Sequence, residues 1–160
     1  MKQRKINCLI IIDMQYDFCN PNGSLFVKGA VEDCERISDW IRKNKEEIDQ
    51  ITLTLDSHTV LDIAHPGFWQ DKDGNNPNPF TLISLDDIKN GVWTPKYFAA
   101  NAIKYISELE AQGEYKHCIW PEHCLIGTKG NAIEDNVAAA VSEWVRQGKF
   151  AIRYVTKGTH

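Results

Sequence analysis

A short, isoleucine-rich stretch near the N-terminus limits the possible folds more than any other feature of the sequence. Between Lys5 and Asp13 every residue except Asn7 is apolar. Because successive residues of a strand point to opposite faces, this stretch predicts a strand buried on both faces, in the middle of a parallel sheet. The apolar run is too short to span a bilayer, and no small-residue cleavage site follows it. We therefore expect neither a membrane span nor a signal peptide.

The remaining chain alternates between helical and strand patterns. The spacing of apolar residues predicts further elements, which are helices at about residues 30–46, 94–113 and 132–148 and strands at residues 51–55 and 150–155. Thr94 followed by Pro95 predicts the start of the second helix, and Asn131 with Glu134 resembles a capping box before the third. This order predicts an α/β sheet with right-handed crossovers, in a single domain over residues 1–160.

One segment fits neither the helical nor the strand pattern of apolar residues. Residues 66–94 contain several prolines and glycines and show no sustained apolar repeat. A connection of this length inside a compact domain is usually functional or disordered, so we expect it to be one or the other.

The composition narrows the classes of protein that the chain can belong to. Aromatic residues make up 10% of the chain, which is too many for a disordered or fibrous protein. The net charge of −4 argues against nucleic acid or an anionic membrane as a partner. The five cysteines are an odd number without Cys-x-x-Cys spacing, which predicts reduced thiols in a cytoplasmic protein.

Charged side chains follow or end three of the predicted strands. Asp13 follows the first strand, Asp56 follows the second, and Lys157 follows the last. Since ligands bind at the carboxyl ends of strands in open α/β sheets, these residues are candidates for a site, and an ion pair between Asp13 and Lys157 is plausible. The structural alternatives are that Asp13 caps a turn and that Lys157 is a solvated surface lysine.

Histidines near the second strand suggest a metal site. His58 lies two residues after Asp56, on the same side of an extended chain, and His65 or His123 could complete a cluster. Mixed aspartate and histidine sets suit a divalent transition metal. A hydrogen-bonded aspartate beside a surface histidine explains the same pattern equally well.

Cys124 directly follows His123, which raises the question of a cysteine nucleophile. Adjacent residues of an extended loop point in opposite directions, so His123 is poorly placed to deprotonate Cys124. Catalytic pairs of this kind usually meet in space and not in sequence. The sequence therefore disfavours Cys124 as a nucleophile.

Five motifs, taken together, resemble the isochorismatase-like cysteine hydrolases, and nicotinamidases in particular. In chain order they are Ile11–Phe18, Gly23–Gly29, Thr54–His58, Trp120–Thr128 and Lys157–Gly158. The resemblance implies a Rossmann-like three-layer sandwich with a parallel sheet. Ser57 stands where nicotinamidases usually have tryptophan, and the long insert that contains His65 resembles a larger branch of amidases.

The resemblance implies a thiol amidase that hydrolyses nicotinamide or a related small amide to the acid and ammonia through a thioester. By position, Asp13 would be the general base and Lys157 would stabilise the thiolate and keep Asp13 ionised. The other implied roles are a metal site on Asp56, His58 and His123, aromatic pocket walls at Phe18 and Trp120, and a second-shell or lid position at His65. Zinc is the expected ion, with manganese or iron as alternatives, and no organic cofactor is expected. A role in NAD salvage follows from the same resemblance.

The family's nucleophilic cysteine lies beyond the lysine, on the turn after the next strand, and none of the five cysteines here matches that position. We therefore expect an N-terminal part of the fold, inactive alone, whose first strand has one edge without a partner. It would form a homo-oligomer or associate with the missing C-terminal segment. The alternatives are a non-catalytic metal- or ligand-binding remnant of the fold, and a complete hydrolase that uses Cys124.

Overall fold

The computed structural model describes residues 5–113, 115–149 and 151–159. The chain divides into two compact units. We call them the sheet unit, which contains the described residues up to His58 and from His123 onward, and the insert unit, Thr59–Glu122. The single domain expected from the sequence stays a prediction.

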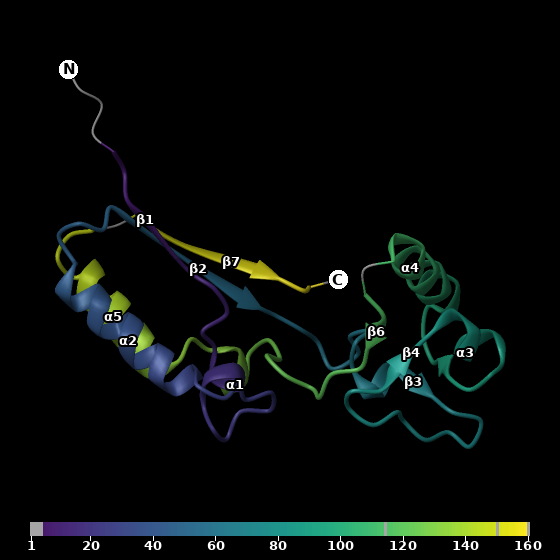
Figure 1. Cartoon of the computed structure of the whole chain (residues 1–160). Coiled ribbons are helices and arrows are strands. Elements are labelled where there is room, and N and C mark those ends of the chain that lie inside the picture. Colours follow the sequence, from purple (N-terminus) through teal and green to yellow (C-terminus); the bar gives the residue numbers. More distant parts are fainter. Residues whose placement is uncertain (1–4, 114, 150, 160) are drawn as a thin grey trace. The chain divides into compact units, whose positions relative to one another are not determined.

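The sheet unit is built on three parallel strands (Figure 1). They are β1 (Cys8–Ile11), β2 (Gln50–Asp56) and β7 (Ile152–Lys157), in the order β1-β2-β7. β7 begins later than predicted, and Phe150 lies outside the described residues. In the register of the sheet Asp56 pairs with Lys157, so these two residues meet at the carboxyl end of the sheet.

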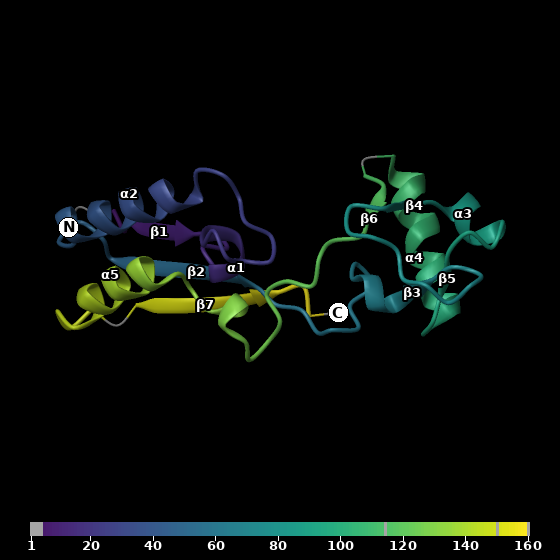
Figure 2. The same cartoon turned by 90° about the horizontal axis from the view of Figure 1, so that it is seen from below.

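Two long helices cover one face of this sheet. They are α2 (Ala30–Lys43) and α5 (Asp135–Val145), and Figures 1 and 2 show both on the same side of the strands; the short helix α1 (Tyr16–Cys19) follows β1. Apolar side chains from strands and helices form the core, and its largest buried members are Ile11, Ile41, Ile48, Ile51, Leu53, Val137, Val141 and Trp144. The sheet unit thus contains the three predicted strands and two of the predicted helices, with α2 ending at Lys43.

The prediction that the first strand is buried on both faces is wrong. Ile11 faces the helices and is 2% exposed, whereas Ile10 on the opposite face is 59% exposed and Ile12 is 67% exposed. Among the described residues, β1 pairs only with β2, so the expected edge without a partner is observed. The physical reason is that no described element covers the second face of β1.

The insert unit consists of short elements around a second core. In chain order they are the 3₁₀ helix η1 (Pro66–Phe68), β3 (Trp69–Gln70), β4 (Leu82–Ile83), α3 (Leu85–Lys89), β5 (Thr94–Pro95), α4 (Ala99–Gln112) and β6 (His117–Cys118). β3 pairs with β5 and β4 pairs with β6, both antiparallel. The core consists of Phe68, Trp69, Ile83, Ala102, Ile106 and Ile119. None of the described helices is long and apolar enough to cross a membrane.

The predicted helix start at Thr94 and Pro95 is wrong. These residues form β5, where they pair with Trp69 and Gln70. The helix α4 begins at Ala99, after a residue in the left-handed conformation. An N-cap residue before proline is therefore not specific to helices, because the same pair suits a short strand. The predicted end of this helix at residue 113 is confirmed.

The predicted capping box of the last helix is also wrong. Asn131 ends a 3₁₀ turn, η2 (Lys129–Asn131), and α5 begins only at Asp135. The N-cap is Glu134, whose carboxylate accepts a hydrogen bond from the backbone N–H of Asn136 at 2.8 Å. The side chain of Asn131 instead donates hydrogen bonds to the carbonyl oxygens of Asp56 and Cys124.

Candidate active site

Lys157 joins two carboxylates at the carboxyl ends of the strands. Its Nζ lies 2.8 Å from Oδ2 of Asp13 and 3.1 Å from Oδ1 of Asp56. The ion pair predicted between Asp13 and Lys157 is present, and Asp56 is a second partner. Partial burial opposes the charge on Lys157, but the hydrogen bonds that its ammonium group donates to Asp13 and Asp56 outweigh this effect and raise the pKa of the group.

Asp13 is fixed by Thr54 as well as by Lys157. The hydroxyl of Thr54 donates to Oδ1 of Asp13 at 2.6 Å and accepts from the backbone N–H of Asp13 at 3.0 Å. The backbone of Asp13 is in the left-handed region, with φ 51°. Thr54 was not predicted as a site residue, although it lies two residues before Asp56 on β2 and so points to the same face.

The predicted metal ligands come together beside this ion pair. Oδ2 of Asp56 lies 3.1 Å from Nε2 of His58 and 3.5 Å from Nε2 of His123. Burial opposes ionisation of Asp56, but hydrogen bonds from His123, His58 and Lys157 outweigh it and hold the pKa of this carboxyl well below its usual range. Asp56 is therefore a carboxylate at neutral pH.

The geometry of these three residues fits a divalent metal ion. One ligand atom from each residue lies within 4.8 Å of the others. Ligands about 2.0–2.2 Å from a shared ion are roughly 3–3.5 Å apart, which agrees with the separations from Asp56 to both histidines. Gly158, at φ +75°, leaves the space open, because a Cβ there would lie 2.8 Å from Cε1 of His58 and 2.9 Å from Oδ1 of Asp56.

The remaining predicted site residues lie in different units. Phe18 is in the sheet unit, and its ring stands edge-on to that of His123, with 5.5 Å between centroids. Trp120 and His65 belong to the insert unit. Trp120 packs edge-on against Phe80, and His65 is fully buried, with Nδ1 3.1 Å from the carbonyl oxygen of Thr59. The roles of Trp120 as a pocket wall and of His65 as a second-shell or lid residue stay predictions.

Cys124 is a poor nucleophile in this structure. It is fully buried, and burial together with the carboxylates of Asp17, Asp56 and Asp13 raises the pKa of its thiol. Its backbone lies in the left-handed region, with φ 48°. These observations agree with the low rank that the sequence assigned to Cys124.

Three further polar residues, which were not predicted as site residues, bind the backbone around the site. They are Gln15, Asp17 and Asn131. Gln15 and Asp17 lie inside the matched motif Ile11–Phe18, which was the available signal. Nothing in the local sequence indicated the role of Asn131, because its partner Asp56 lies 75 residues away in the chain.

A comparison with curated proteins finds a nicotinamidase. No family model matches the chain. The nicotinamidase of Saccharomyces cerevisiae is 26% identical over 129 residues, which cover 81% of this chain and 49% of that protein. The chain therefore spans about half the length of the curated relative that it matches.

Solved structures of nicotinamidases have the same fold. The yeast nicotinamidase bound to the inhibitor nicotinaldehyde matches 96% of this chain and 57% of its own, with a TM-score of 0.63 and 24% identity. A nicotinamidase and pyrazinamidase from Acinetobacter baumanii matches 99% of this chain and 55% of its own, with a TM-score of 0.54 and 20% identity. The resemblance to nicotinamidases and the α/β fold with a parallel sheet are thereby confirmed.

Proposed function

We propose, from the shared fold and motifs, that this chain carries the base, the lysine and the metal site of an amidohydrolase. Its substrate would be nicotinamide or a related small amide, which it would help to convert to the acid and ammonia. The observation that carries the proposal is the bridge of Lys157 between Asp13 and Asp56, beside His58 and His123.

Asp13 is suited to act as the general base. Its two carboxylate oxygens accept from Thr54 and Lys157, so the group is held in one orientation. It would take the proton of a cysteine thiol and pass it to the leaving amine, while Lys157 stabilises the thiolate. We place that cysteine outside the 160 residues, because Cys124 is buried and its thiol pKa is raised.

Asp56, His58 and His123 would hold the metal ion. Zinc is the first candidate for this donor set, and manganese and iron are the alternatives. When bound, the ion would orient the ring nitrogen of the substrate and supply a coordinated water. Phe18, whose ring lies against His123, would form one wall of a flat pocket.

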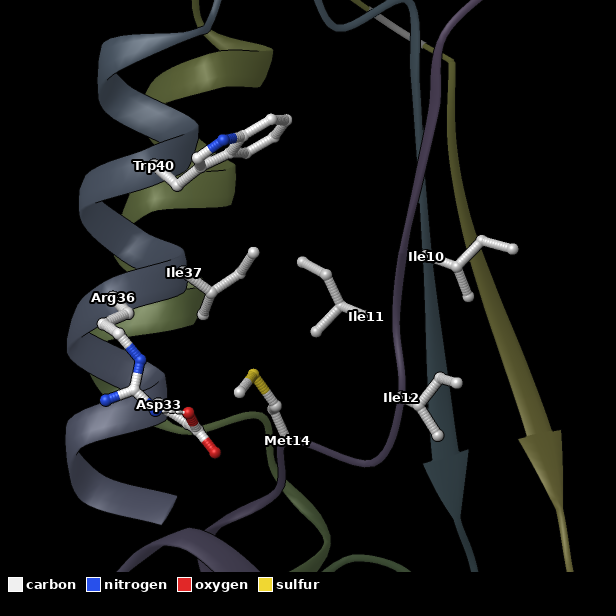
Figure 3. A pocket seen from close by; sticks show the side chains of 8 residues that line it. All are labelled: Ile10, Ile11, Ile12, Met14, Asp33, Arg36, Ile37 and Trp40. Atoms are coloured by element: carbon white, nitrogen blue, oxygen red, sulfur yellow. Dashed lines mark hydrogen bonds and ion pairs between the residues drawn. The ribbon is translucent and has the colours of Figure 1, made fainter. Parts of the chain in front are cut away.

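The edge of β1 that has no partner strand among the described residues supports an association of this chain with another polypeptide segment. A groove of about 450 Å³ lies between β1 and α2. Its lining residues are Ile10, Ile11, Ile12, Met14, Asp33, Arg36, Ile37 and Trp40. Figure 3 shows Ile11 pointing toward α2, and Ile10 and Ile12 pointing away from it. An edge strand with exposed apolar side chains tends to pair with another strand.

We therefore propose that the chain forms a homo-oligomer or binds a segment equivalent to the unmatched part of its relatives. Size-exclusion chromatography with light scattering tests this association. A well-behaved monomer of 18.3 kDa would contradict it.

A cytoplasmic location and a role in NAD salvage belong to the same proposal. All five cysteines are free thiols, which suits a reducing compartment. Nucleic acid and membranes are not proposed as partners, since the net charge is −4.

The test is ammonia release from nicotinamide. The 160-residue chain should release no measurable ammonia, whereas a longer product of the same reading frame that supplies the cysteine should be active. Asp13→Asn and Lys157→Met should each lower that activity by about 100-fold or more, because general base and thiolate stabilisation are lost. Asp39→Asn serves as the matched control, because the side chain of Asp39 on α2 is exposed and does not line the groove beside β1.

Two outcomes would change the proposal. Ammonia release by the 160 residues alone, dependent on Asp13 and Lys157 and blocked by iodoacetamide at Cys124, would make Cys124 the nucleophile. Binding of metal and nicotinamide without turnover in either chain would favour the non-catalytic remnant.

A further inference from the structure

A buried side-chain amide binds the backbone of one metal-ligand residue at both of its polar ends. Gln15 is 0% exposed. Its Nε2 donates to the carbonyl oxygen of Asp56 at 2.7 Å, and its Oε1 accepts from the backbone N–H of Asp56 at 2.7 Å. The side chain of Gln15 thus takes the place of a neighbouring strand at the end of β2. Nε2 also donates to the carbonyl oxygen of Asn131 at 2.9 Å.

The side chain of Asn131 joins the two ligand-bearing segments to each other. Its Nδ2 lies 2.8 Å from the carbonyl oxygen of Asp56, 3.1 Å from Oγ of Ser57 and 3.2 Å from the carbonyl oxygen of Cys124. Asp56 and Ser57 precede the ligand His58, and Cys124 follows the ligand His123. One amide group therefore ties segments that are more than sixty residues apart in the sequence.

A third side chain holds the second segment from the other side. Oδ2 of Asp17 accepts from the backbone N–H of Cys124 at 2.7 Å, and Oδ1 accepts from the N–H of Ser24 at 3.1 Å. The two segments are also paired directly, because the N–H of His58 donates to the carbonyl oxygen of Cys124 at 3.1 Å. Buried hydrogen bonds of this kind are costly to break, since they leave polar groups unpaired.

We propose that Gln15 and Asn131 are positioning residues that set the spacing of Asp56, His58 and His123 before any ion binds. The inference rests on the proposed metal site. A metal ion binds more tightly when its ligands are already at the right separation. Mutation of the residues that hold metal ligands in place typically lowers the metal affinity by about 10–100-fold. None of the hydrogen bonds described requires an ion to form.

The test uses the full chain and the variants Asn131→Ala and Gln15→Met. Met keeps the length of Gln15 but removes its amide. The matched control is Val137→Ala, a fully buried position on α5 in the same unit, whose side chain has no hydrogen-bonding group. It lowers stability without removing a hydrogen bond near the ligands.

Zinc affinity is measured by competition with a chromophoric chelator. Asn131→Ala and Gln15→Met should bind zinc about 10–100-fold more weakly than the parent, while Val137→Ala stays within about twofold. The visible absorption of bound cobalt reports the coordination geometry. The cobalt spectrum should change in Asn131→Ala and Gln15→Met but not in Val137→Ala. If Gln15 and Asn131 only stabilise the fold, the spectrum should change to the same extent in all three variants.

Amide hydrogen exchange of the metal-free protein is a second test of whether these residues hold the two ligand-bearing segments. Amides in residues 54–58 and 123–128 should exchange faster in Asn131→Ala and Gln15→Met than in Val137→Ala. If Gln15→Met does not fold, Asn131→Ala alone decides, because Asn131 is only partly buried.

The two proposals can fail separately. Parent-like zinc affinity, cobalt spectrum and exchange in the positioning variants would overturn the inference. A parent chain that binds no zinc would overturn the metal site, and the exchange rates would then decide whether Gln15 and Asn131 hold the two segments.

Discussion

The two units use their histidines in different ways. In the sheet unit, His58 and His123 approach the carboxylate of Asp56, within 3.1 and 3.5 Å. In the insert unit, His65 and His117 lie 3.1 and 3.0 Å from the backbone carbonyl oxygens of Thr59 and Ile63. Histidines bound to backbone carbonyls stabilise a loop, whereas histidines gathered around a carboxylate can bind a metal. Residue type alone does not distinguish the two uses.

The largest expected effect concerns the core of the insert unit. Trp69 is fully buried, and its Nε1 donates to the carbonyl oxygen of Ile63 at 2.6 Å. Trp69→Ala should lower the free energy of unfolding by about 3–5 kcal/mol. Trp40→Ala is the control, because Trp40 in the sheet unit is 45% exposed and should have a small effect. Hydrogen exchange should rise in residues 59–122; an equal rise in the sheet unit would show that the units unfold as one.

The second effect tests the two uses of histidine. His123→Ala should weaken zinc binding by at least about 100-fold, or about 2.7 kcal/mol, because it removes one of the proposed ligands. His117→Asn should leave zinc affinity within about twofold, since that ring contacts a backbone carbonyl. Metal analysis of both purified variants checks this. Equal zinc content in His123→Ala and the parent would remove His123 from the site.

The third effect compares two glycines. A Cβ on Gly130 would overlap the carboxylate of Asp17, which accepts from the N–H of Cys124. Gly130→Ala should therefore cost about 1–3 kcal/mol in the free energy of unfolding. Gly67→Ala in the insert unit should cost much less, because the nearest atom to its Cβ is the carbonyl oxygen of Val60 at 3.8 Å. Denaturant unfolding measures the free energy of unfolding of both variants. Equal decreases in the two would mean that the carboxylate of Asp17 moves away from the new Cβ at little cost.

The smallest effect is a pH dependence in the insert unit. Burial lowers the pKa of His117 below its ordinary value of 6.5, although the carbonyl of Ile63 and the charge of Asp62 oppose this. Above pH 6.5 the ring is neutral in both states. As the pH falls below 6.5, His117 binds a proton in the unfolded chain but stays neutral in the folded unit. The unit therefore loses stability as the pH falls from 6.5 to the pKa of His117 in the folded state. The loss is about 1.4 kcal/mol for each pKa unit of difference.

His117→Asn should remove this dependence, because it removes the titrating ring. Amide hydrogen exchange in the insert unit, measured between pH 7.5 and 5, gives the stability of the unit at each pH. The slope of stability against pH is then compared between the unchanged protein and the variant. The same slope in both would assign the acid sensitivity to another group.

The sequence predicted the sheet unit much better than the insert unit. Long periodic segments become α2, α5 and the three strands, because their apolar faces meet one continuous core. Parallel strands also bring their carboxyl ends to one edge, so Asp13, Asp56 and Lys157 could be predicted as neighbours. The insert unit has strands of two residues, which carry no period.

The two wrong helix starts have a common cause. Thr94 and Asn131 carry the residue types of helix caps, but tertiary partners decide their structure. Thr94 pairs with Gln70, and the amide of Asn131 binds Asp56 and Cys124. Gln70 and Asp56 are far from these residues in sequence, so local patterns do not show the pairing. The exposure of Ile10 was missed for a related reason, because a pattern of apolar residues does not show whether another element covers them.

The left-handed backbone of Asp13 restricts which residues can replace it. Aspartate, asparagine and glycine tolerate this conformation, whereas other residues meet a steric penalty of about 1–2 kcal/mol. Of the three, aspartate alone carries a carboxylate, so even glutamate is a poor substitute. A single-base change in an aspartate codon gives asparagine, which fits the backbone but cannot accept a proton as a base. Mutation at this position can therefore remove the proposed base without unfolding the sheet unit, so folded chains that lack this carboxylate can arise by a single base change.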